Sequence, residues 1–139
     1  MGVRTGSFDP TRFRSVFYLA AVWNLSAAAG ALLFPQYHAE LFFGSPLAVA
    51  TPAAVLNSQI VWVSVAFFGV GYWMVAREPT RNHGLILVAT LGKIYVGLRW
   101  IWAFGQGIVT PFAVVGAAGD LMFASIFAIF LLKAKRSSN

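Results

Sequence analysis

Four long apolar runs constrain this chain more than any other feature of its sequence. They cover residues 15–34, 52–76, 84–104 and 109–132. Each is long enough to cross a bilayer, which takes about 20 residues in a helix. Backbone polar groups inside lipid must be satisfied within the spanning segment, so each run is expected to be helical. The sequence therefore predicts an all-α protein, a bundle of four transmembrane helices in up-down-up-down order.

The composition supports a single integral membrane domain over residues 1–139. Hydrophobic residues make up 59% of the chain and charged residues only 10%, whereas an average soluble domain is roughly 25% charged. The four runs leave little chain for anything else. We expect the first run to be retained rather than cleaved as a signal peptide, because it continues beyond its small residues through Leu32, Leu33 and Phe34.

The basic residues outside the apolar runs are distributed unevenly. The connections 35–51 and 105–108 contain no Lys or Arg. The other flanks carry eight basic residues: Arg4, Arg12, Arg14, Arg77, Arg81, Lys133, Lys135 and Arg136. This asymmetry is the positive-inside pattern, and it predicts that both termini are cytoplasmic. The bilayer explains the net charge of +6, and we expect no nucleic-acid partner.

The residue types needed for common catalytic and cofactor sites are scarce. The chain has no cysteine, which excludes a disulfide, a thiolate-bound cluster and covalent attachment of c-type haem. Its two histidines, His38 and His83, fall in loops on opposite sides of the membrane. We therefore expect no metal, no cofactor and no catalytic residue, and an enzyme is the least favoured class.

Two charged residues lie deep within the last two runs. Counting outward from the turn at residues 105–107 places Lys93 opposite Asp120. A lone charge at that depth costs about 2.5 to 3.5 kcal/mol even on lenient insertion scales, so a facing pair is expected. Asp120 also shares a helical face with small residues, which mark close helix contacts in membranes: Ala113, Gly116, Ala117, Ala124 and Ala128.

Four further polar residues lie inside the apolar runs. Asn24 falls in a strip of alanines and should point into the bundle, either as an interhelical hydrogen bond or as a ligand contact. Asn57, Gln59 and Arg99 share a depth of roughly 8 to 10 Å below the outer surface, from a rise of about 1.5 Å per residue. We expect these three side chains to line an outward-facing, water-filled pocket with Arg99 as its cationic wall.

Two segments outside the runs carry local signals. Asp9, Pro10 and Thr11 are typical of a helix start, with Asp9 as the cap. Residues 37–43 could form a short interfacial helix ended by Gly44, with His38 and Glu40 facing water or the bundle. A His-x-Glu pair is a weak metal signature, and a solvated loop is the favoured interpretation.

The second half of the chain is similar to a family of small bacterial four-span membrane proteins, loosely akin to the DoxX-like group. The resemblance rests on residues 69–72, the turn formed by 77–79 and 81–82, Gly92 with Lys93, residues 119–121, and Phe123 with Ala124. It implies a four-helix bundle in the bacterial inner membrane with Lys93 and Asp120 at its polar centre. Some DoxX-like proteins are associated with quinone-linked oxidoreductases, but no cofactor motif here supports that role.

Two functions remain open from the sequence. One is a binding or permeation protein for a small polar, anionic or amphipathic ligand, because intramembrane ionisable residues often mark such pathways. Its polar centre would comprise Asn24, Lys93 and Asp120. The other is a non-catalytic accessory subunit of a larger membrane complex or a homo-oligomer. In that case the Lys–Asp pair would only fix the helix register.

Overall fold

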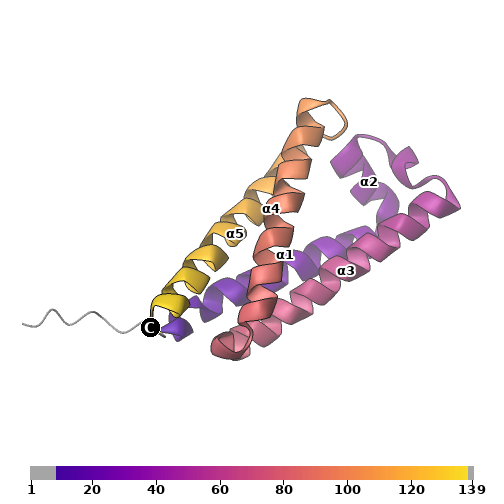
Figure 1. The fold of residues 1–139 in the computed structure, drawn as a ribbon. Coiled ribbons are helices and arrows are strands. Elements are labelled where there is room, and N and C mark those ends of the chain that lie inside the picture. Colours follow the sequence, from indigo (N-terminus) through magenta and orange to yellow (C-terminus); the bar gives the residue numbers. More distant parts are fainter. Residues whose placement is uncertain (1–8, 138–139) are drawn as a thin grey trace, which may run out of the picture.

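A computed structural model describes residues 9–137, and all of its regular elements are helices (Figure 1). Arg4, which contributes to the predicted charge asymmetry, lies outside this range. In chain order the elements are η1 (Pro10–Phe13), α1 (Arg14–Leu33), α2 (Pro35–Phe43), η2 (Pro46–Val49), α3 (Pro52–Arg77), η3 (Pro79–Arg81), α4 (His83–Gly105) and α5 (Pro111–Ser137).

Four helices are long and apolar enough to cross a membrane: η1 continued by α1, then α3, α4 and α5. They alternate in direction, so the predicted all-α, up-down-up-down class is confirmed. The two ends of the described chain meet at one end of the bundle, where the rings of Phe13 and Phe130 lie 5.2 Å apart. Which side of the membrane this end occupies stays a prediction from the charge pattern.

Local sequence explains where the helices begin and end. Asp9 accepts a hydrogen bond from the Thr11 backbone at 2.9 Å, which confirms the predicted start. α1 ends at Leu33, because Pro35 disfavours a helical conformation of the preceding residue, Phe34. The last span begins at Pro111 rather than at residue 109, since proline suits the first helical position. The turn between α4 and α5 contains Gly107 with φ at 68°, a conformation that favours glycine.

The spans pack as two helix pairs that diverge from one end (Figure 1). α1 runs along α3 and α4 along α5, whereas α3 and α4 contact each other little. Glycine allows the close approach within each pair. A Cβ at Gly69 would lie 2.8 Å from Leu25 Cγ, and one at Gly97 would lie 2.7 Å from Leu121 Cγ. Gly97 thus allows the close contact between α4 and α5.

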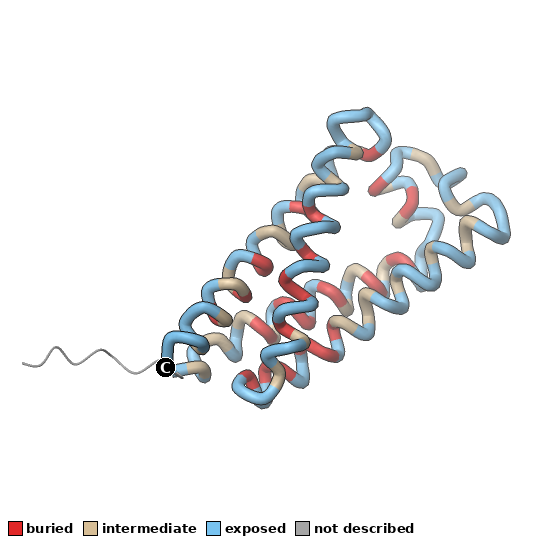
Figure 2. The backbone as a smooth tube through the Cα atoms, in the orientation of Figure 1, coloured by how far each residue is buried: buried red, intermediate tan, exposed pale blue. Residues whose placement is uncertain are grey.

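The predicted short helix is confirmed as α2, ended by Gly44 in the left-handed conformation at φ 71°. It lies at the end where the two helix pairs are farthest apart (Figure 1). The Thr110 backbone N–H donates to the Phe42 carbonyl at 2.8 Å, and the Thr110 hydroxyl donates to the Leu41 carbonyl. The large side chains with little or no exposure concentrate toward the opposite end of the bundle: Phe17, Tyr72, Val75, Ile86, Phe127 and Phe130 (Figure 2).

Candidate functional site

Lys93 and Asp120 form an ion pair between α4 and α5. The Lys93 Nζ lies 2.5 Å from Asp120 Oδ1, which is the pairing predicted from the hairpin register. The side chain of Lys93 is only 6% exposed and that of Asp120 17% exposed. Because both groups are ionisable and lie within spans, each reduces the cost of placing the other in lipid.

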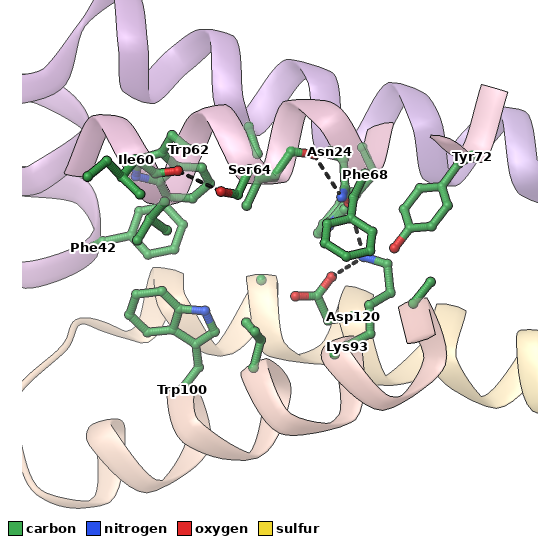
Figure 3. A pocket seen from close by; sticks show the side chains of 18 residues that line it. Asn24, Phe42, Ile60, Trp62, Ser64, Phe68, Tyr72, Lys93, Trp100 and Asp120 are labelled. Carbon is green, nitrogen blue, oxygen red and sulfur yellow. Dashed lines mark hydrogen bonds and ion pairs between the residues drawn. The ribbon is translucent and has the colours of Figure 1, made fainter. Parts of the chain in front are cut away.

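Asn24 joins this pair to the other helix pair. Its Oδ1 accepts a hydrogen bond from Lys93 Nζ at 3.0 Å, and its Nδ2 donates to the Val65 carbonyl at 3.3 Å (Figure 3). One buried amide therefore connects α1, α3 and α4, and Lys93 extends the connection to α5. This network is the polar centre of the bundle, and we use that term for Asn24, Lys93 and Asp120 together.

Aromatic rings surround the ammonium group of Lys93. Its Nζ lies 5.5 Å from the ring centroids of both Tyr72 and Phe123. Cation–π attraction at such distances is worth about 0.5 to 2 kcal/mol, and more when water is excluded. Among the described residues Asp120 has no hydrogen-bond partner other than Lys93, so its Oδ2 is free to accept a further hydrogen bond.

A cavity of about 370 Å³ opens above the polar centre, between the two helix pairs (Figure 3). On α3 its lining extends from Ile60 to Tyr72, a length of about 18 Å at 1.5 Å per residue. All four spans and α2 contribute side chains. The remaining lining residues are Trp23, Asn24, Ala27, Phe42, Val61, Trp62, Ser64, Val65, Phe68, Ala89, Gly92, Lys93, Val96, Trp100, Gly116 and Asp120.

Three of the residues expected in a pocket do not line this cavity. Asn57, Gln59 and Arg99 are exposed and absent from its walls. Arg99 lies six residues after Lys93, about 120° around the helix from it, and therefore belongs to another face. Its guanidinium carbon stacks 4.2 Å from the Trp102 ring centroid. The expected water-filled pocket with Arg99 as its wall is therefore replaced by an apolar cavity with a polar base.

The aromatic side chains in the cavity wall were not predicted from the sequence. Trp100 follows Lys93 by seven residues, which is two helical turns and hence the same face. Phe68 and Tyr72 are likewise one turn apart on α3. These spacings could have revealed part of the lining. The contribution of Phe42 depends on the docking of α2, which no local pattern encodes.

His38 on α2 lies among aromatic rings at the edge of this region. Its ring stacks on Phe42 at 4.4 Å and meets the Trp62 ring edge-on at 4.5 Å. Its Nε2 is buried without a hydrogen-bond partner in the described part of the chain. Burial lowers the pKa of His38 below its ordinary value. His38 and Glu40 were expected to face either water or the bundle. His38 packs on the protein, whereas Glu40 is exposed.

Comparison with known proteins finds no matching family model and no matching solved structure. Among curated proteins, the probable potassium transport system protein Kup of Pseudomonas savastanoi pv. phaseolicola is 32% identical over 88 residues, 63% of this chain. The Kup protein of Pseudomonas fluorescens is 35% identical over 81 residues, 58% of this chain. The matched regions span only 13% and 12% of those proteins.

The structure and the comparisons agree on the broad class. This is a small multi-pass membrane protein. Its four membrane-length helices carry that conclusion, and the partial similarity to Kup is consistent with it. The comparisons add no support for the DoxX-like resemblance, and they assign no family.

Proposed function

We propose that this protein binds a small amphipathic molecule within the bilayer of the bacterial inner membrane, with both termini cytoplasmic. The observation that supports the proposal best is an ion pair with unused hydrogen-bonding capacity at the base of an apolar cavity. Ligand sites are typically apolar concavities of about 300 to 1,000 Å³ with a few placed polar groups. The cavity between the two helix pairs matches that description.

The chemistry of the polar centre favours an uncharged head group. Lys93 and Asp120 together carry no net charge: the ammonium of Lys93 would oppose a cation, and the carboxylate of Asp120 would oppose an anion. Asp120 Oδ2 can accept a hydrogen bond, and the third N–H of Lys93 can donate one. A hydroxyl or amide satisfies both groups at once. The aromatic walls then accommodate the apolar part of the molecule.

Transport of potassium is the second candidate, and the partial similarity to Kup is the observation in its favour. The cavity chemistry argues against it, because the Lys93 ammonium belongs to the polar base of the cavity and repels cations. Asp120, the only acidic residue in the lining, is already paired with that ammonium. The test is potassium flux into vesicles that contain the protein. If such flux occurs and Asp120→Leu abolishes it, transport would replace the binding proposal.

The proposal is tested by the molecules that the protein retains on purification. The wild type would be extracted with its native lipid in polymer-bounded discs, and bound molecules identified by native mass spectrometry. The Lys93→Met/Asp120→Leu double variant removes the polar base without leaving an unpaired charge, and Arg99→Gln is the matched control outside the cavity. We expect wild type and Arg99→Gln to retain an uncharged amphiphile and the double variant to lose it.

Equal retention by the double variant, or no retention by the wild type, would reject the binding role. The accessory-subunit alternative, in which the pair only fixes helix register, would then be preferred.

A further inference from the structure

The cavity is closed at the end nearest the predicted outer surface. Phe42 on α2 is only 7% exposed there, and its ring packs 5.2 Å from the rings of both Trp100 and Phe112. The hydrogen bonds from Thr110 to the last carbonyls of α2 hold this helix against the α4–α5 hairpin. A water-soluble molecule would have to displace α2 to enter along the bundle axis.

On the side between α1 and α5 the cavity is bounded by Trp23, which is 36% exposed. Its indole lies directly against Gly119, where an added Cβ would overlap the ring. The same indole packs 6.2 Å from the ring of Phe123. Trp23 therefore fills the space between these two helices at the level of the polar centre.

The side between α3 and α4 is more exposed than the side that Trp23 bounds. The cavity wall there is built from residues that are also exposed: Ile60 is 57% exposed, Val61 55% and Val96 40%. Gly92 belongs to the same wall, and a Cβ built on it would meet nothing within 4 Å. α3 and α4 make few contacts with each other. In a bilayer these apolar positions face hydrocarbon, so the gap between α3 and α4 is continuous with the lipid.

We infer that the ligand enters sideways from the bilayer through this gap, which we call the α3–α4 portal and define by Ile60, Val61, Gly92 and Val96. The inference rests on the proposed binding function and specifies its ligand class: a single-chain amphiphile dissolved in the membrane, with an uncharged hydroxyl-like head. Its chain lies along the apolar walls and its head reaches Asp120. A two-chain phospholipid is too large for a cavity of about 370 Å³.

Gly92 provides a sharp test because α4 contains a matched control. Gly92 and Gly84 are both exposed glycines of α4 with open space around them, but only Gly92 lines the cavity. Both changes replace a glycine of α4, Gly84 in its first turn and Gly92 in its interior, and only Gly92→Leu obstructs the portal. Val96→Trp, one turn further along α4, obstructs it independently. Thermal melting of all three variants checks that they fold.

The probe is a long-chain alcohol bearing a photoreactive diazirine, added to phosphatidylcholine vesicles that contain the protein. Crosslinked peptides are then mapped by mass spectrometry. We expect labelling of the α3 and α4 cavity residues in wild type and Gly84→Leu. In Gly92→Leu and Val96→Trp it should fall about tenfold, which corresponds to about 1.4 kcal/mol of binding free energy. Unlabelled hexadecanol should compete, and a short water-soluble diol should not.

Unchanged labelling in both portal variants would overturn the sideways route, and competition by the short diol would overturn the ligand class. Neither result bears on whether the polar centre binds a molecule, because that is decided by retention in the Lys93→Met/Asp120→Leu variant. Loss of labelling in Gly84→Leu to the same extent would also reject the portal.

Discussion

At the scale of single residues, polar and aromatic contacts accommodate Lys93 inside a membrane span. Its ammonium contacts Asp120 and Asn24 by hydrogen bonds and lies beside two aromatic rings. Buried ion pairs rarely add net stability, because desolvation offsets their attraction. The pair is therefore better explained as a means of holding two hydrogen-bonding groups at mid-membrane depth than as a source of stability.

This explanation predicts strong coupling between the two residues. Lys93→Met and Asp120→Leu alone each leave an uncompensated buried charge, which costs about 3 to 5 kcal/mol, whereas losing both is much milder. Both single variants should lower the melting temperature in detergent, and the double variant should recover most of the loss. Losses that simply add in the double variant would show that the two side chains do not stabilise one another.

At the scale of elements, α2 connects the two helix pairs at the end of the bundle where they are farthest apart (Figure 1). Phe42 contacts α3 through Trp62, α4 through Trp100 and α5 through Phe112. His38 packs on the same aromatic group, and among residues 9–137 its Nε2 has no hydrogen-bond partner. We therefore expect the docking of α2 to depend on the charge of His38.

The docking of α2 should weaken in acid. Because burial lowers the pKa of His38 below 6.5, the undocked state binds protons first as the pH falls, and it gains stability relative to the docked state. The contribution of His38 is thus complete above about pH 6.5 and declines below that value. Wild type should melt at a lower temperature at about pH 5 than at about pH 7.5, and His38→Phe should lose most of this difference. The same pH dependence in both proteins would contradict the role of His38.

The sequence predicted those elements whose geometry is local. A tight turn links α4 to α5, so counting from it was enough to pair Lys93 with Asp120. Helical periodicity likewise placed Asn24 toward the bundle. The divergence of the two helix pairs could not be predicted, because it depends on contacts between distant segments. For that reason equal depth did not bring Asn57, Gln59 and Arg99 together: depth specifies position along a helix, and the face depends on packing.

At the scale of the whole molecule, the two helix pairs meet at one end and enclose the cavity toward the other (Figure 1). The end where they meet carries η3 and both ends of the described chain. The positive-inside rule predicts that this basic end faces the cytoplasm. The closed α2 end would then face outward, and the α3–α4 portal would face the lipid between the two surfaces.

The orientation can be measured directly because the chain contains no cysteine. A cysteine at Ser45 or Gln106 should react with an impermeant thiol reagent added to whole cells whose outer envelope has been made permeable. A cysteine at Thr80, in η3, should react only after lysis. Labelling of Thr80→Cys in intact cells, with protection of the other two, would reverse the topology.

The central claim is that the cavity holds an uncharged amphiphile on the polar centre, and a fluorescence titration tests it most directly. Trp23, Trp62 and Trp100 line the cavity, whereas Trp73 and Trp102 do not. A bromine-bearing long-chain alcohol should quench the wild type in vesicles in two parts, a saturable component from the cavity and a linear component from tryptophans exposed to lipid. In the Lys93→Met/Asp120→Leu variant the apparent affinity of the saturable component should fall about tenfold or more, or about 1.4 kcal/mol. Only the linear component should then remain over the concentration range that saturates the wild type. Identical titration curves for the two proteins would contradict the account.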